Sequence, residues 1–231
     1  MQCMTRITLA HSRPPVAGNW LLSSRPESPR PAVQTLPHTK TVIMKLARAA
    51  IGGLVLAAAP LAAMADGMSY SYVEADYVDI DIDDAPSGDG FGLRGSVGFL
   101  DNLFVFVDYT DASVSIVDIE TIAVGVGGHY PLGSNFDAVG RIGYAEADLS
   151  ASGFGSVGDD GYLLSLGLRG QVAQQFELEG NVIYTDFSDG GDETAFEVVG
   201  RWNFTDMFSA GLAYRVGDDV NTFYAGVRLS W

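Results

Sequence analysis

The last nine residues of the chain, "FYAGVRLSW" at positions 223–231, decide the fold class. Every second residue in this stretch is apolar: Phe223, Ala225, Val227, Leu229 and Trp231. A period of two indicates a β-strand with different surroundings on its two faces. Chain ends fray unless another element holds them. The sequence therefore predicts that this terminal strand pairs with another strand.

An export signal is predicted at residues 44–65, "MKLARAAIGGLVLAAAPLAAMA". Lys45 and Arg48 precede a short apolar run, and Ala63 and Ala65 supply the small residues that a signal peptidase reads. The run is too short for a membrane helix, which needs about 20 apolar residues. We predict cleavage after Ala65. Residues 1–43 are interpreted as a mis-annotated or disordered N-terminal extension, which leaves residues 66–231 as the folded domain.

The predicted mature chain is acidic and lacks cysteine, because Cys3 is the only cysteine in the sequence. From Gly67 onward there are six arginines, no lysine and 27 acidic residues, a formal net charge of −21. Nucleic-acid binding is excluded because phosphates would be repelled. No stretch after Ala65 is apolar for 18 residues, so no membrane helix is predicted there.

Segments with a period of two recur ten times in the mature chain. Most have the length of a tilted strand that crosses a bilayer, about 9–11 residues. Short connections alternate with longer, acidic, glycine-rich ones such as "DLSASGFGSVGDD" at 148–160, which is the habit of outer-membrane barrels. The predicted strands are 69–80, 90–99, 103–112, 119–130, 135–147, 161–173, 175–187, 194–204, 207–216 and 222–231.

The two faces of these strands favour a membrane barrel over a soluble sandwich. When the strands are phased by their large apolar residues, all six arginines fall on the opposite face, as either fold would require. Aromatic residues cluster near both strand ends instead of mid-strand, which is typical of interfacial girdles. We predict an all-β, up-and-down antiparallel transmembrane β-barrel of ten strands, with eight as the alternative, closed by pairing of the last strand with residues 70–80.

The signal, the girdled strands and the C-terminal aromatic strand resemble the small outer-membrane β-barrel proteins of Gram-negative bacteria, the OmpA-like, OmpX-like and opacity-type grouping. The resemblance implies residence in the outer membrane among lipid and lipopolysaccharide. It also implies delivery by periplasmic chaperones to the barrel-assembly machinery. In that grouping the final strand is the assembly signal, here carried by Phe223, Leu229 and Trp231. We expect a monomer.

The predicted lumen face carries a charge network. Buried charges must be paired and hydrogen-bonded, so we expect a largely plugged, salt-bridged lumen in a structural or surface-interaction protein. A narrow porin-like channel is the alternative. The predicted network residues are Glu74, Asp76, Arg94, Asp108, Arg141, Arg169, Glu177, Glu179, Glu197, Arg201, Arg215 and Arg228.

Enzymatic and metal chemistry find little support in the sequence. His129 is the only histidine after Ala65, and its spacing suggests no partner for general-base catalysis, which a protease or lipid A-modifying barrel would need. We expect it in the lumen floor beside a carboxylate, and we predict no enzyme and no cofactor. A weak metal candidate is the acidic loop that holds Asp79, Asp81, Asp83 and Asp84, although it lacks the glycine and glutamate of a calcium loop.

Overall fold

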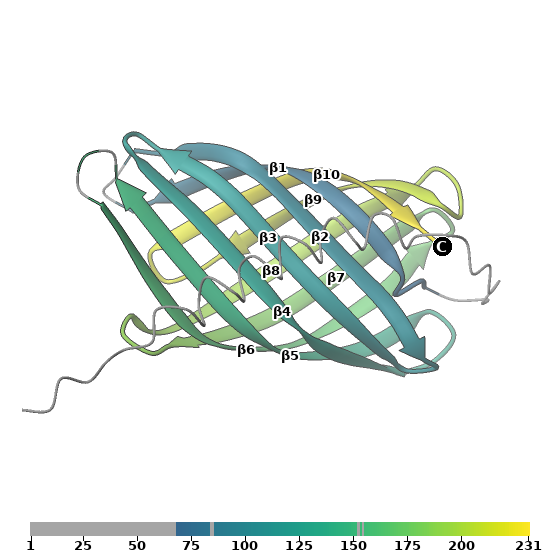
Figure 1. Ribbon diagram of the computed structural model, residues 1–231. Coiled ribbons are helices and arrows are strands. Elements are labelled where there is room, and N and C mark those ends of the chain that lie inside the picture. The colour runs from purple at the N-terminus through teal and green to yellow at the C-terminus, as the bar shows by residue number, and fades with distance from the viewer. Residues whose placement is uncertain (1–67, 84–85, 152, 154) are drawn as a thin grey trace, which may run out of the picture. The chain divides into compact units, whose positions relative to one another are not determined.

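Ten antiparallel strands close into one barrel in the computed structural model, which describes residues 68–83, 86–151, 153 and 155–231 (Figure 1). Ten strands, and not eight, are therefore correct. The predicted extension and signal peptide lie outside the described residues. The strands are β1 (Tyr72–Ile82), β2 (Gly88–Leu100), β3 (Leu103–Val114), β4 (Val117–Pro131), β5 (Phe136–Ala151), β6 (Gly155–Ala173), β7 (Phe176–Phe187), β8 (Gly191–Asn203), β9 (Phe208–Val216) and β10 (Val220–Ser230).

Closure of the barrel depends on the terminal strand, as the sequence predicted. β10 pairs with β1 from Tyr72↔Ser230 to Ile82↔Val220. Beyond the ladder, the Trp231 backbone N–H donates to the Ser71 carbonyl oxygen at 3.1 Å. The start of β1 and the end of β10 therefore lie at the same end of the barrel, which we call the turn end. The opposite end, where β1–β2, β3–β4, β5–β6, β7–β8 and β9–β10 connect, is the loop end.

The connections at the loop end are shorter than the sequence suggested. Residues 148–160 were expected to form a loop, but Asp148↔Gly158 and Ala151↔Gly155 continue the β5–β6 ladder. Residues 111–118 likewise belong mostly to β3 and β4, with Ser115 at φ 59° in the turn. Valine, isoleucine and leucine lie between the acidic residues of these segments, so the apolar–polar alternation of a strand continues through them. The prediction that these residues form loops was therefore wrong. Within the described residues, no helix has the length and hydropathy needed to cross a membrane.

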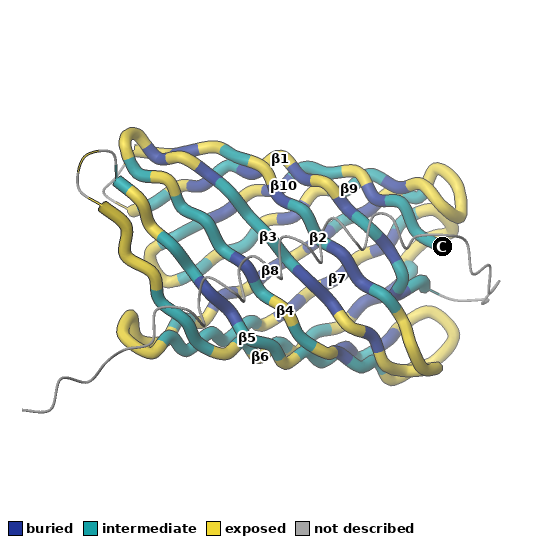
Figure 2. The backbone as a smooth tube through the Cα atoms, in the orientation of Figure 1, coloured by how far each residue is buried: buried dark blue, intermediate teal, exposed yellow. Residues whose placement is uncertain are grey.

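Burial alternates along the strands, as Figure 2 shows by colour. On β1 the even-numbered residues from Tyr72 to Ile80 are buried, whereas Tyr77 between them is 51% exposed. Neighbouring side chains point to opposite faces of a strand, so the buried set lines the lumen and the exposed set covers the outside. The outside is largely apolar: Leu164, Leu166 and Leu168 of β6 are all exposed.

The aromatic girdles are present at both ends of the outer face. Towards the loop end, Phe91, Tyr162 and Tyr214 are exposed to similar degrees. Towards the turn end, the exposed aromatic residues are Phe99, Tyr130, Phe136, Trp202, Phe204 and Phe208. Such rings favour the two water–hydrocarbon boundaries of a bilayer.

The lumen beside β3, β4 and β5 is filled by aromatic rings over glycines. Phe104 and Phe106 are 1% and 3% exposed and stand directly opposite Gly127 and Gly125 in the β3–β4 register. A Cβ atom on Gly127 would collide with the Phe104 ring. Glycine in a strand commonly marks such a close approach, so these glycines make room for the two rings.

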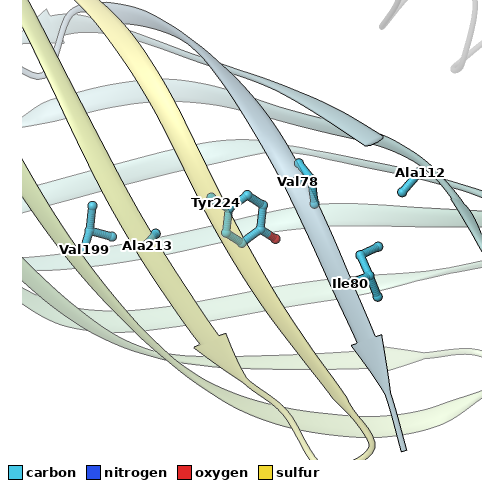
Figure 3. Packing of buried hydrophobic residues seen from close by; sticks show 6 residues of the cluster. All are labelled: Val78, Ile80, Ala112, Val199, Ala213 and Tyr224. Carbon is cyan, nitrogen blue, oxygen red and sulfur yellow. The ribbon is translucent and has the colours of Figure 1, made fainter. Parts of the chain in front are cut away.

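A single apolar row crosses the lumen face of the other wall. Val199, Ala213, Tyr224 and Val78 are consecutive register partners across β8, β9, β10 and β1. They form a buried cluster with Ile80 and Ala112, and Figure 3 shows these side chains on the same side of the strands. On β1 this cluster lies on the loop side of the charged residues Glu74 and Asp76.

Candidate functional site

The candidate functional site is the lumen, where the predicted charged residues meet. One cross-strand row consists of Arg228, Glu74, Arg94 and Asp108, which are consecutive register partners on β10, β1, β2 and β3. Their charges alternate in sign along the row. Opposite charges at directly paired positions stabilise a sheet, whereas like charges would destabilise it.

The most buried part of the network is a chain of five charged side chains. Glu74 Oε2 accepts a hydrogen bond from Arg228 Nε at 2.5 Å and one from Arg201 Nη2 at 3.3 Å. Arg201 Nη1 donates to Glu177 Oε1 at 2.5 Å, and Arg169 Nη2 donates to Glu177 Oε2 at 2.9 Å. Because β9 and β10 separate β8 from β1, the Arg201–Glu74 contact spans part of the lumen.

Three further ion pairs surround this chain. Arg94 Nε lies 3.1 Å from Asp76 Oδ2, and Arg141 Nη2 donates to Glu179 Oε1 at 3.3 Å. The third pair joins adjacent strands, with Arg215 Nη2 and Glu197 Oε2 2.7 Å apart. Among the described residues, Asp108 is the one predicted network member without an ion pair of 4.0 Å or less, because its register partner Arg94 turns to Asp76.

Aromatic rings support most of the arginines, a role that strand alternation alone did not reveal. The Arg228 guanidinium lies 3.5 Å from the centre of the Tyr72 ring. Arg94 and Arg215 lie 4.5 Å and 5.4 Å from the centre of the Tyr224 ring. A cation over an aromatic face is stabilised by the ring quadrupole, by about 0.5–2 kcal/mol. Tyr72 and Tyr224 thus hold the arginines in place from the same wall.

His129 at the turn end has the carboxylate neighbour that was expected, and the structure identifies it as Asp137. Its Nδ1 lies 3.2 Å from Asp137 Oδ2, without the alignment of a hydrogen bond. The hydrogen bond to Asp137 Oδ2 comes from the Tyr70 hydroxyl at 2.8 Å. The expectation that His129 lies beside a carboxylate agrees with this position, because Asp137 of β5 lies diagonally across the β4–β5 ladder from His129. The Tyr70 ring stacks on His129 with 4.0 Å between the ring centres.

The predicted acidic loop does not assemble into a metal site in the part of the chain that the structure describes. Asp79 and Asp81 lie on β1, and Asp83 follows the strand, whereas Asp84 is outside the described residues. Among the described residues, no three His, Cys, Asp or Glu side chains are grouped to hold a metal ion.

The residues proposed as the assembly signal occupy the outer face of β10. Phe223 is 37% exposed, and Leu229 and Trp231 are half-buried at the turn end. Their arrangement continues the girdle, and their role in assembly stays a prediction.

Sequence reasoning missed several lumen residues that contact the network. Asn181 donates from Nδ2 to Glu179 Oε1 at 3.1 Å, and Asp137 and Tyr70 form the group beside His129. The alternation that placed the arginines inside also places Asn181 and Asp137 inside, so that signal was available. Tyr70 fell within the predicted strand 69–80, on the face of Tyr72 and Glu74, but β1 begins only at Tyr72, so the contacts of Tyr70 come from a segment without strand pairing.

Comparison with known proteins agrees with this architecture. The family described as "Outer membrane protein beta-barrel domain" matches residues 50–230. No curated protein matches the chain significantly. Similar solved structures include the NanC porin, at 10% identity and a TM-score of 0.46, covering 69% of this chain and 100% of the porin. The N-terminal barrel of Pseudomonas aeruginosa OprF is 10% identical, with a TM-score of 0.41 and coverage of 70% and 100%. The attachment invasion locus protein Ail of Yersinia pestis is 16% identical, with a TM-score of 0.37 and coverage of 71% and 99%.

Proposed function

This chain belongs to the outer-membrane protein β-barrel family and resides in the bacterial outer membrane, and from that premise we propose that it is a structural, surface-exposed barrel whose lumen is closed by its own charged side chains. The turn end then faces the periplasm and the loop end faces outward, as in barrels with short periplasmic turns. Solute passage is not its role.

The observation that carries this proposal is the burial of the charged chain in the lumen. The side chains of Arg201, Glu74 and Glu177 are 2%, 4% and 6% exposed. Charges that lined a water-filled channel would be solvated, whereas these three are covered by one another and by their neighbours. Removing one partner from such a buried pair costs about 3–5 kcal/mol, because the other charge is left unpaired. The network therefore both fills the lumen and holds distant strands together.

The surface part of the proposal rests on where the positive charges are. All six arginines of the mature chain lie at lumen-facing positions, and every lysine precedes residue 46. The charged side chains at the loop end are therefore carboxylates. Asp148 and Asp160 are examples, on the part of the β5–β6 hairpin that extends towards the loop end. We propose that this acidic end meets lipopolysaccharide and outside partners as a monomer.

A second candidate function is a narrow passive channel, which the less buried side of the network favours. The Arg215 side chain is 36% exposed and that of Arg141 is 18% exposed. Asp108 has no ion pair within 4.0 Å among the described residues. A thin wet path beside these three residues would carry small ions while Arg201 stays covered.

Planar-bilayer recording of the refolded protein separates the two candidates. The structural proposal expects no steady single-channel current from wild type, with correct folding checked by the different gel mobility of boiled and unboiled samples. A matched pair of variants, Arg201→Ala and Arg215→Ala, removes one covered and one wetter arginine. A stable, cation-selective current from wild type that Arg215→Ala alters and Arg201→Ala does not would establish the channel instead.

A further inference from the structure

The four residues before β1 cross the turn end of the lumen, and no ladder holds them. Both β1 ladders begin at Tyr72, so residues 68–71 have no strand partner of their own there. Tyr70 is nevertheless only 8% exposed, and it packs in a buried cluster with Phe104, Phe106 and Val139. Met68 packs against the margin of the same cluster. We call residues 68–71 the strap.

Hydrogen bonds tie the strap to strands all around the mouth of the barrel. On β2, the Ser96 hydroxyl donates to the Tyr70 carbonyl oxygen at 2.7 Å, and the Gly98 N–H donates to Ser71 Oγ at 3.1 Å. From β6, Arg169 Nη1 donates to the Ser69 carbonyl oxygen at 2.9 Å. The Ser69 hydroxyl donates to a main-chain oxygen of Trp231 at 2.9 Å, just beyond β10.

The Tyr70 side chain makes the remaining contacts, on the opposite wall. Its hydroxyl donates to Asp137 of β5 at 2.8 Å. Its ring stacks on His129 of β4 at 4.0 Å between centres and on Phe104 of β3 at 5.2 Å. The strap therefore joins the seam between β1 and β10 to the far wall, and it covers the lumen floor from the periplasmic side.

We propose that the strap is an intramolecular lid on the periplasmic mouth, which opens without unfolding the barrel and then exposes Val139 and Phe104 to the periplasm. Apart from the Trp231 N–H bond to the Ser71 carbonyl oxygen, its hydrogen bonds to the barrel each involve a side chain and are individually weak, whereas the barrel ladders are continuous. Segments held in this way open locally at a cost below that of global unfolding. The inference rests on the proposed closed lumen, because the charge network above the lid must stay shut when the lid opens.

The position of the strap in the chain indicates when it docks onto the barrel during maturation. With the predicted cleavage after Ala65, only Asp66 and Gly67 would precede the strap. The lid is then the amino-terminal segment of the mature protein, and it takes its place once both chain ends are in the barrel, because Ser69 and Ser71 bond to Trp231.

Cysteine accessibility tests the lid directly. Cys3 is the only natural cysteine, so Cys3→Ser gives a cysteine-free background for Val139→Cys, a probe beneath the lid, in folded full-length protein in detergent micelles. The measured quantity is the rate of reaction with a small charged methanethiosulfonate. Tyr70→Gly should raise this rate at least about tenfold, since it removes a buried ring and a hydrogen bond together worth more than about 1.4 kcal/mol. Tyr70→Phe keeps the ring and should raise it about threefold to tenfold.

Two controls distinguish opening of the lid from a general loosening of the barrel. Tyr130→Gly removes a tyrosine of the same end that is 71% exposed on the outer face, and it should leave the rate unchanged. Ala213→Cys, a probe in the apolar row, should react slowly with or without Tyr70. A Val139→Cys rate that neither Tyr70 substitution changes would overturn the lid, and Tyr70→Phe alone decides this if Tyr70→Gly does not fold. Rapid reaction of Ala213→Cys in the Tyr70 background would instead show an open lumen, which contradicts the proposed function and not the lid.

Discussion

The two walls of the lumen fill the same barrel in opposite ways. The wall of β7, β8, β9, β10 and β1 brings in long charged side chains that pair with one another, with the Arg201 side chain only 2% exposed. The wall of β3, β4 and β5 has glycines, which lack side chains, opposite Phe104 and Phe106, so the two rings lie over the glycines. Both walls place buried side chains in the lumen. The first depends on charge complementarity and the second on shape.

The largest expected effect breaks the charged wall. Arg201→Ala should lower the free energy of unfolding by about 3–5 kcal/mol, because Glu74 and Glu177 each lose a buried partner. Urea-induced unfolding in lipid vesicles measures it. Arg215→Ala is the matched comparison, because Arg215 is 36% exposed and water can take its place beside the buried Glu197, so the loss should be smaller. Equal losses from the two variants would contradict a dry charged wall.

A smaller effect breaks the glycine wall. Gly127→Ala forces a methyl group into the Phe104 ring, and such overpacking costs about 1–3 kcal/mol. Gly180→Ala serves as the control, because nothing lies within 4 Å of its added Cβ. The same unfolding assay applies, with Phe104→Leu combined with Gly127→Ala to restore space. If the double variant is no more stable than the sum of the two single effects predicts, the Phe104 ring is not the reason that position 127 must be glycine.

The smallest expected effect tests how separate the walls are. Arg141 belongs to both, since it pairs with Glu179 and lies 5.9 Å from the Phe104 ring centre and 5.8 Å from that of Phe106. Gly127→Ala should therefore couple to Arg141→Ala by at least about 0.5 kcal/mol in a double-mutant cycle. Gly127→Ala and Arg201→Ala share no partner and should add within about 0.5 kcal/mol. Coupling of the same size in both cycles would mean that the lumen packs as a single unit.

The sequence predicted the strands and the inward arginines because both follow from alternation. A charged side chain facing lipid is costly, so the position of Arg228 within "FYAGVRLSW" already indicates its face. The pairing of Arg228 and Arg201 on one carboxylate, Glu74, could not be predicted, because it depends on barrel size and strand stagger. Strand ends at the loop end were also missed, since alternation continues through the acidic residues there.

The specific contacts of the strap and of His129 could not be predicted for a different reason, although residues 69–71 were included in the predicted strand 69–80. Tyr70 contacts residues of β2, β3, β4 and β5 through a segment without strand pairing. Periodicity gives the face of Tyr70 but not its partners, because only the closed barrel brings them within reach.

The span of the Glu74 contacts along the chain has a consequence for folding speed. Glu74 bonds to Arg201 and Arg228, which are 127 and 154 residues away. Contacts between distant residues form late and slow the folding of β-proteins. Because Arg228 lies on β10, Glu74 gains its full set of bonds only when the last strand arrives. These bonds should therefore be absent from the folding transition state. Weakening them should accelerate unfolding and leave the folding rate nearly unchanged, so the network acts as a kinetic lock on a barrel that has already closed.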